Sequence, residues 1–213
     1  MAKGYWFLNL DVVNPVDYIT YREATFAYAR AHGFRYVIRG GDFEQLEGIK
    51  RHRNVLVELP SYEDAVTLYD ASDYRPVRDL RGATAIADLA AVEGFDGPQL
   101  SPEPPEGTAD NPRGYWMVKV DVTDPDRYKD YAAAAAEAFT EYGAWFLVRG
   151  GRNHLLEGHG RSRYVVTAFK DVATARACYF SPAYQKARAI RQEASVADFL
   201  IVSGYTGREL PPA

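Results

Sequence analysis

The chain carries one sequence pattern twice, and this internal repeat constrains its fold more than any other feature. The motif Arg-Gly-Gly, with Leu-Glu-Gly a few residues later, begins at Arg39 and again at Arg149, an offset of 110 residues. The same offset aligns residues 4–94 with residues 114–204 without a gap, and about 28 of the 91 aligned positions are identical. We therefore expect two copies of one domain in tandem.

Each copy has the signals of the order strand, helix, strand, strand, helix, strand. An alternating apolar strand begins at Tyr5, and Asn14-Pro15 supplies the N-cap and first-turn proline of a helix that Gly33 ends. Ser61 caps the second helix, and a last strand covers residues 87–92. The second copy repeats these signals.

The glycine pair lies inside a strand pattern. We expect the strand that begins at Arg35 to have a bulge or a close backbone approach at Gly40-Gly41 and to end at Leu46-Glu47-Gly48. A hairpin would then join it to the antiparallel strand over residues 55–59.

This element order predicts an α+β fold in which each repeat is ferredoxin-like, with a four-stranded antiparallel sheet and both helices on one face. The bare sheet face of each repeat needs a cover, which the other repeat supplies, so the two pack sheet to sheet into a barrel. We expect repeats over 1–94 and 114–206, a proline-rich linker over 95–113 and a C-terminal tail over 207–213.

Composition narrows the function. The net charge of −4 argues against a nucleic-acid partner, and no apolar run approaches the length of a membrane span. The single cysteine, Cys178, cannot form an internal disulfide, and no secretory signal opens the chain, so we expect a cytoplasmic protein. Nucleotide-binding and serine-hydrolase motifs are absent from the sequence.

Six short motifs in order resemble a bacterial domain-of-unknown-function family, number 1330, of the dimeric α+β barrel superfamily. The second copy shows most of them, as Asp124-Pro125-Asp126-Arg127-Tyr128, Tyr142-Gly143, Arg149-Gly150-Gly151, Leu156-Glu157-Gly158 and Ser181-Pro182-Ala183-Tyr184. The first copy departs at Ala71-Ser72-Asp73-Tyr74 and at His32-Gly33.

The resemblance implies an intrachain dimeric α+β barrel, because members with one domain pair as homodimers and here the pair is fused. We therefore expect a monomer or a weak homodimer. The superfamily includes cofactor-independent monooxygenases, haem-binding enzymes, isomerases and stress-response barrels, so the resemblance implies the fold and leaves the function open.

Arg39 and Arg149 are the first candidate site residues. A guanidinium within an apolar strand needs a partner, and its planar fork suits a substrate carboxylate or phosphate. The alternative is an internal salt bridge to Glu47, Glu157, Asp11 or Asp121.

Glu47 and Glu157 are candidates for a general base, if burial raises their pKa. The alternative is a salt bridge to a neighbouring arginine, which could be Arg51, Arg53, Arg161 or Arg163. His154 adds a second group that can move a proton, and together with Glu157 and His159 it also has ligand types that bind zinc or iron. We weigh a metal or haem site here and expect no cofactor.

Differences between the copies favour the second as the active one. Lys119, Trp145 and His154 replace Asn9, Arg35 and Glu44. The many tyrosines at helical spacing are interpreted as packing between helix and sheet.

These residues together predict a barrel that binds a small anionic or aromatic metabolite. As an enzyme it would be a cofactor-independent isomerase, lyase or monooxygenase; the alternatives are a non-catalytic binding module and a haem or metal binder. The expected catalytic residues are Glu157, His154 and Tyr179. Substrate binding is assigned to Arg149, Arg39, Glu47, Tyr115, Lys119 and Trp145.

Overall fold

The computed structural model describes residues 2–207 and has two α+β repeats, as the sequence predicts. The elements of the first repeat are β1 (Gly4–Val12), α1 (Pro15–Ala31), β2 (Arg35–Arg39), β3 (Phe43–Glu47), β4 (Arg53–Leu59), α2 (Tyr62–Thr67), η1 (Leu68–Asp70), α3 (Arg75–Gly82) and β5 (Ala85–Glu93). Those of the second are β6 (Gly114–Val122), α4 (Pro125–Glu141), β7 (Trp145–Arg149), β8 (Asn153–Glu157), β9 (Arg163–Phe169), α5 (Val172–Phe180), α6 (Pro182–Ala194) and β10 (Ser195–Ser203). From residue 208 on, the expected tail lies outside the described residues.

The predicted helix starts are confirmed by their cap geometry. The Asn14 side chain accepts a hydrogen bond from the Asp17 N–H, and Asp124 accepts two at the start of α4. Ser61 and Ser181 cap α2 and α6 in the same way. Each cap satisfies an N–H group that has no partner inside its helix, which fixes where the helix begins.

The two faces of β1 are buried in different cores. Trp6 and Leu8 pack under the helices of the first repeat. Tyr5 and Phe7 face the other way, into a core between the two sheets that also contains residues of the second repeat. The Phe7 and Tyr164 rings meet there at 5.2 Å between centroids. Alternation along a strand thus gives β1 a helix side and a barrel side.

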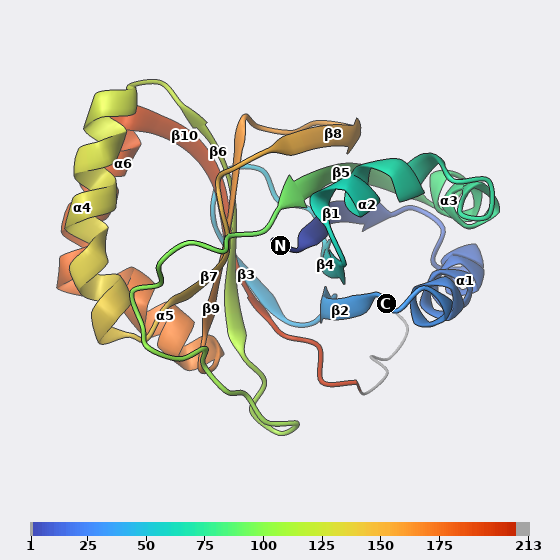
Figure 1. Cartoon of the computed structure of the whole chain (residues 1–213), viewed down its shortest axis with the longest axis horizontal. Coiled ribbons are helices and arrows are strands. Elements are labelled where there is room, and N and C mark those ends of the chain that lie inside the picture. The colour runs from blue at the N-terminus through green and yellow to red at the C-terminus, as the bar shows by residue number, and fades with distance from the viewer. Residues whose placement is uncertain (1, 208–213) are drawn as a thin grey trace.

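The two sheets exchange one strand each. One sheet has the order β2-β4-β1-β5-β8 and the other the order β3-β10-β6-β9-β7, so β3 pairs with the second repeat and β8 with the first. In Figure 1, β8 lies beside β5, while helices cover the outer side of each sheet. The predicted antiparallel pairing with β4 is confirmed for β2, but residues 43–47 form β3 in the other sheet instead of extending β2. The prediction of four strands in each sheet is wrong, because each sheet has five.

The glycine pair permits the exchange. Gly40 and Gly41 have φ angles of 74° and 107°, in the left-handed region that costs glycine least. They turn the chain out of β2, and β3 continues along β10 of the other sheet instead of extending β2.

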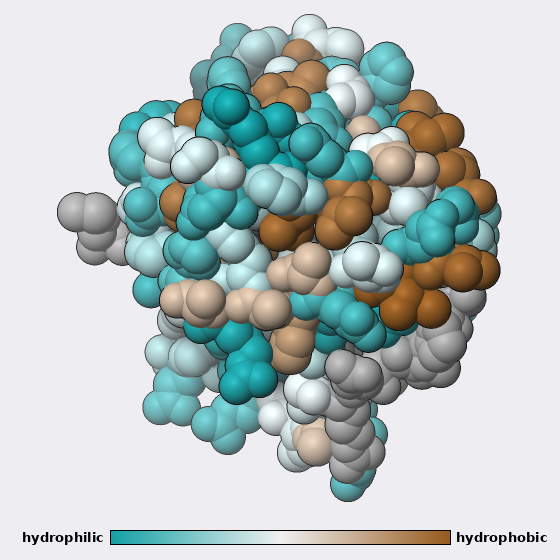
Figure 2. Space-filling view, turned by 90° about the vertical axis from the view of Figure 1, so that its right-hand side faces the viewer, coloured by the Kyte–Doolittle hydropathy of each residue, from teal (hydrophilic) through white to brown (hydrophobic). Residues whose placement is uncertain are grey.

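The outer helical faces of the two repeats differ. Val13 and Val16 are exposed in the first repeat, where the second has Thr123 and Asp126. Figure 2 shows apolar patches among hydrophilic ones on the side of the molecule that carries the first repeat.

None of the helices within residues 2–207 combines the length and apolar character that a membrane span requires.

Gly48, which follows β3, is a position where any side chain would collide with β10 of the other sheet. Its φ is 74°, and a Cβ there would lie 2.5 Å from the Ala197 carbonyl oxygen of β10. We expect Gly48→Ala to destabilise the protein by at least 2 kcal/mol, because left-handed strain of about 1–2 kcal/mol adds to a backbone clash. The measurement is urea-induced unfolding. Gly33→Ala is the control: its φ is 69° but the space beside it is open, so only the strain of about 1 kcal/mol remains. Equal losses would contradict the close approach of β3 and β10.

Candidate functional site

A cleft opens between the first helix and the sheet of each repeat. In the first repeat, Tyr18 and Tyr21 of α1 face the outer side of β1 and β4, and the cleft holds about 460 Å³ of space, its open mouth included. The matching cleft in the second repeat, under α4, holds about 530 Å³. We call these the first and the second cleft.

The two clefts share their chemistry position by position. Each is lined by one tryptophan, two tyrosines and three arginines at matched positions, although fewer than a third of all aligned residues are identical. The matched pairs are Trp6 and Trp116, Tyr18 and Tyr128, Tyr21 and Tyr131, Arg39 and Arg149, Arg53 and Arg163, and Arg81 and Arg191.

Two of the three matched arginines in each cleft have no carboxylate partner among residues 2–207. In the first cleft, Arg39 donates to the Arg22 carbonyl oxygen and lies 4.3 Å from the Phe26 ring centroid. Arg53 donates to the carbonyl oxygen of Arg39. No described carboxylate forms an ion pair with Arg39 or Arg53, so the positive charge of these two guanidinium groups is not balanced within residues 2–207.

The second cleft has the same imbalance. Arg149 lies over the Phe146 ring at 4.5 Å, and Arg163 donates to the Arg149 carbonyl oxygen at 3.0 Å. Burial, and then the nearby charge of Arg163, lower the pKa of Arg149. Burial also raises the pKa of Tyr128 to about 12, so this phenol stays protonated at neutral pH.

The third arginine of each cleft is held by the opposite repeat. Arg191, which is 2% exposed, donates to Glu47 at 2.6 Å, and Arg188 and Tyr179 donate to the same carboxylate oxygen. In the first cleft, Arg81 and Tyr69 donate in the same way to Glu157. Glu47 ends β3 and Glu157 ends β8. Strand exchange therefore places each glutamate against the third arginine of the other repeat.

Both expectations for Glu47 need correction. Burial tends to raise its pKa, but hydrogen bonds and charge from Arg191, with those from Tyr179 and Arg188, outweigh burial and leave the pKa below its usual range. Glu47 is thus an ionised anchor for Arg191, not a base with a raised pKa. Glu47 does form ion pairs with arginines, but its partners are Arg188 and Arg191 and not the expected Arg51, Arg53, Arg161 or Arg163.

The salt bridges considered for Arg39 and Arg149 are not formed. Asp11 binds Arg51 and His52, and Asp121 binds Arg161. Both arginines instead line the clefts.

The expected catalytic residues are not brought together. Glu157 lies with Arg81 of the first repeat, whereas Tyr179 lies with Glu47 beside the second cleft. His154 is exposed on β8 opposite Ala91 and lines neither cleft. Strand exchange is the cause, since it moves β8 away from the sheet to which Arg149 belongs.

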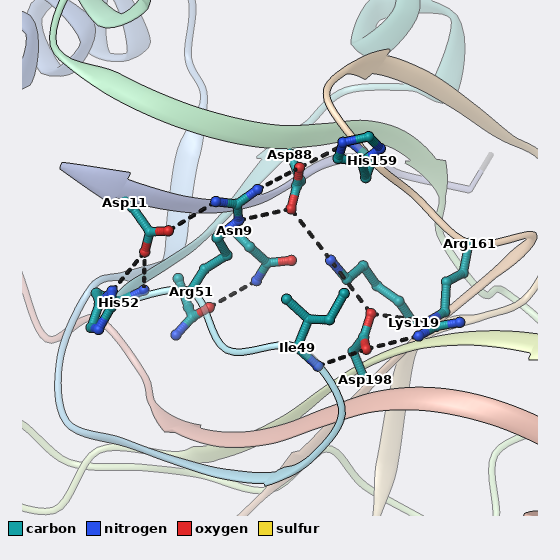
Figure 3. Close-up of polar contacts among 11 residues, drawn as sticks. Asn9, Asp11, Ile49, Arg51, His52, Asp88, Lys119, His159, Arg161 and Asp198 are labelled. Carbon is teal, nitrogen blue, oxygen red and sulfur yellow. Dashed lines mark hydrogen bonds and ion pairs between the residues drawn. The ribbon is translucent and has the colours of Figure 1, made fainter. Parts of the chain in front are cut away.

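Three expected substrate-binding residues lie in or beside the barrel interior. Tyr115 is buried in the core between the sheets, and Trp145 packs against that core. Lys119 lies with its Nζ 3.9 Å from Asp88 and 3.8 Å from Asp198. Figure 3 shows Lys119 enclosed between these two aspartates.

The aspartates around Lys119 fasten the exchanged strands. Asp198 accepts from the Ile49 N–H, which follows β3, and Asp88 accepts from the His159 N–H, which follows β8 (Figure 3). Burial lowers the pKa of Lys119, and the two aspartates partly offset this. Lys119 therefore forms ion pairs with both aspartates inside the barrel. It lines neither cleft.

No metal centre forms in the described part of the chain. Within residues 2–207, no three His, Cys, Asp or Glu side chains come together in the manner of a metal site, including His154, Glu157 and His159. Cys178 is buried in the core of the second repeat.

Most residues of the clefts were not predicted from the sequence. Arg53 and Arg163 were considered only as salt-bridge partners of the glutamates, Arg81 and Arg191 were given no role in a site, and the paired tyrosines were interpreted as packing. Their signal was identity between the copies: five arginine positions are unchanged at the 110-residue offset, and three of those five line the clefts.

The chain has two α+β layers, with their sheets face to face and their helices outside. This arrangement defines the dimeric α+β barrel class, and here a single chain forms the whole barrel. The chain belongs to the family described as "Domain of unknown function (DUF1330)", which matches residues 3–95 and again residues 113–205. The two matches confirm the tandem arrangement of this family's domain.

Solved structures share the whole architecture. An anthrone oxidase-like protein aligns over 100% of this chain and 96% of its own, with a TM-score of 0.56 and 14% identity. A mutant chlorite dismutase from Candidatus Nitrospira defluvii aligns over 94% of this chain and 91% of its own, with a TM-score of 0.55 and 11% identity. At these identities the likeness shows the fold alone. No curated protein sequence matches the chain.

Proposed function

We propose that each cleft binds a small organic anion with an aromatic or apolar body, of which a carboxylate is the simplest kind. The observation that carries this proposal is the pair of arginines in each cleft without a carboxylate partner in residues 2–207. A partly buried charge without a partner is costly, and a bound anion removes that cost.

The remaining walls suit the rest of such a molecule. Trp116, Phe146 and Phe199 give the second cleft an aromatic lining, and Trp6 and Tyr36 do so in the first. A planar guanidinium binds a carboxylate through two parallel hydrogen bonds, while aromatic rings contact the apolar body. The expected ligand therefore has a negative charge at the end that meets the arginines and an apolar body that the aromatic rings of the cleft surround.

Binding is the function that this geometry supports, more than proton transfer. No Asp, Glu, His or Cys in residues 2–207 lines either cleft, so the clefts offer hydrogen-bond donors and positive charge but no proton acceptor. Acid–base chemistry by Glu157 and His154 would need both side chains to contact one ligand. Glu157 accepts a hydrogen bond from Arg81, whereas His154 is exposed and lines neither cleft.

The residues do not fit a haem bound through histidine. His32 pairs with Asp73 and His52 with Asp11, both outside the clefts, and His154 and His159 are exposed. An axial imidazole is therefore lacking at either cleft within the described residues.

The test of the proposal uses the three tryptophans as separate reporters. Trp6 lines the first cleft, Trp116 lines the second, and Trp145 packs against the barrel core. In an NMR titration of the full chain with benzoate, we expect the indole N–H signals of Trp6 and Trp116 to shift and that of Trp145 to stay. Benzamide, the uncharged counterpart, is expected to cause much smaller shifts.

The variant Arg149→Met keeps the length of the side chain and removes its charge. We expect it to weaken benzoate binding at Trp116 roughly ten- to a hundredfold, the loss of a charge-assisted contact, with no change at Trp6. Arg152→Met is the control, since Arg152 is exposed and already paired with Glu63 and Glu93. Unchanged spectra with benzoate at millimolar concentration, or equal losses in both variants, would overturn the proposal.

A further inference from the structure

The two clefts differ in where their hydroxyl groups lie. In the first, the hydroxyl oxygens of Thr25 and Tyr36 are 3.4 Å apart and share a hydrogen bond. The second has Ala135 and Phe146 at these positions, so both hydroxyls are missing. It has instead Thr167 in place of Val57.

Thr167 is a buried polar group without a partner. It lines the second cleft and is 1% exposed, and its Oγ1 has no hydrogen-bond partner among residues 2–207. Buried hydroxyls are almost always paired, because an unpaired one loses its bonds to water without replacement. Valine, which has the same shape, fills the matched position of the first cleft, so the fold does not need the hydroxyl.

The position of Thr167 relative to the arginines sets the size of the ligand. Arg163, Val165 and Thr167 alternate along β9 and share the face that lines the cleft. Arg149 is in register with Val165, and Phe146 with Thr167. Thr167 therefore lies two residues, or about 7 Å along the strand, from the level of Arg149. One aromatic ring with polar groups at opposite ends is of this size.

We propose that the second cleft selects an aromatic carboxylate that carries a hydroxyl or carbonyl group at the end opposite its carboxylate, and that Thr167 determines this preference. Arg149 and Arg163 hold the carboxylate, and the Thr167 hydroxyl pairs with the distal oxygen once its side chain turns about χ1 to face the ligand. The first cleft, with Val57 at this position, lacks the preference. This inference rests on the anion binding proposed above and adds the ligand class of one cleft.

The experiment compares 4-hydroxybenzoate with 4-methylbenzoate, which differ at the distal end by a hydroxyl against a methyl group of similar size. Both are titrated into the full chain, with the indole N–H of Trp116 reporting the second cleft and that of Trp6 the first. At Trp116 we expect 4-hydroxybenzoate to bind three- to tenfold more tightly, as one hydrogen bond to a buried hydroxyl provides. At Trp6 we expect similar affinities.

Two variants assign the preference to the hydroxyl. Thr167→Val removes it at constant shape and is expected to make the two affinities at Trp116 equal, without changing those at Trp6. Thr167→Ser keeps the hydroxyl and is expected to keep the preference.

The outcomes separate the two proposals. Equal affinities at Trp116 in the unaltered chain, or a preference that survives Thr167→Val, would overturn the role of Thr167 and leave anion binding standing. If neither compound shifts Trp6 or Trp116, anion binding and the inference built on it both fail.

Discussion

Glu47→Gln is expected to lower the free energy of unfolding by about 3 kcal/mol, the effect of removing one partner of a buried ion pair. The glutamate belongs to the first repeat, but Arg191, Arg188 and Tyr179 of the second repeat all donate to it. Without its negative charge, the Arg191 guanidinium stays buried and unbalanced. Urea-induced unfolding at pH 7 measures the change.

Glu44→Gln is the matched control on the same strand. Glu44 also pairs across the repeats, with Arg176, but these side chains are 42% and 57% exposed. An exposed pair contributes little, so we expect a loss below about 1 kcal/mol. If both variants lost the same stability, the buried anchor at Glu47 would have no special weight.

The effect of Glu47→Gln should also depend on pH. Because the pKa of Glu47 in the folded chain is lower than the ordinary glutamate value of 4.5, its ion pair stabilises the fold above that value. This stabilisation disappears as the pH falls through the lower folded pKa. The difference between Glu47→Gln and the unaltered chain is therefore expected to be full at pH 7 and to shrink below about pH 4.5.

The second large effect is expected when the repeats are separated. Residues 1–96 and 97–213, produced apart, should each fail to form a stable monomer. In the first piece β3 has lost β10, its sheet partner, and the barrel side of β1 is open to water. Light scattering combined with amide NMR spectra measures the assembly and folding of each piece. We expect poorly dispersed spectra or association, and recovery of the native spectrum when the two pieces are mixed.

A chain cut only in the linker separates the roles of connection and pairing. A protease site placed at Glu106-Gly107 and cleaved after folding should leave the two parts associated, because the exchanged strands and the shared core persist. A monomeric half with a well-dispersed spectrum would contradict the dependence of each repeat on the other.

Local sequence determined the elements and their faces. Asn14 and Ser61 cap helices because their side chains reach N–H groups two or three residues away, and this geometry depends on no other part of the chain. Trp6 and Phe7 face opposite cores because a strand alternates. The 110-residue offset then implied two similar domains, and the need to cover two bare sheet faces implied the barrel.

Only the tertiary structure decided which residues meet. The glycine pair at Gly40 marks an irregular strand, but the choice between β4 and β10 as the partner of β3 depends on the packing of both sheets. That choice takes Glu47 to Arg191, 144 residues away, and leaves Arg149 without a carboxylate in the described chain. The clefts follow from contacts between distant segments, whose pairing is set by the burial of both sheets at once, whereas periodicity and capping report only on neighbours along the chain.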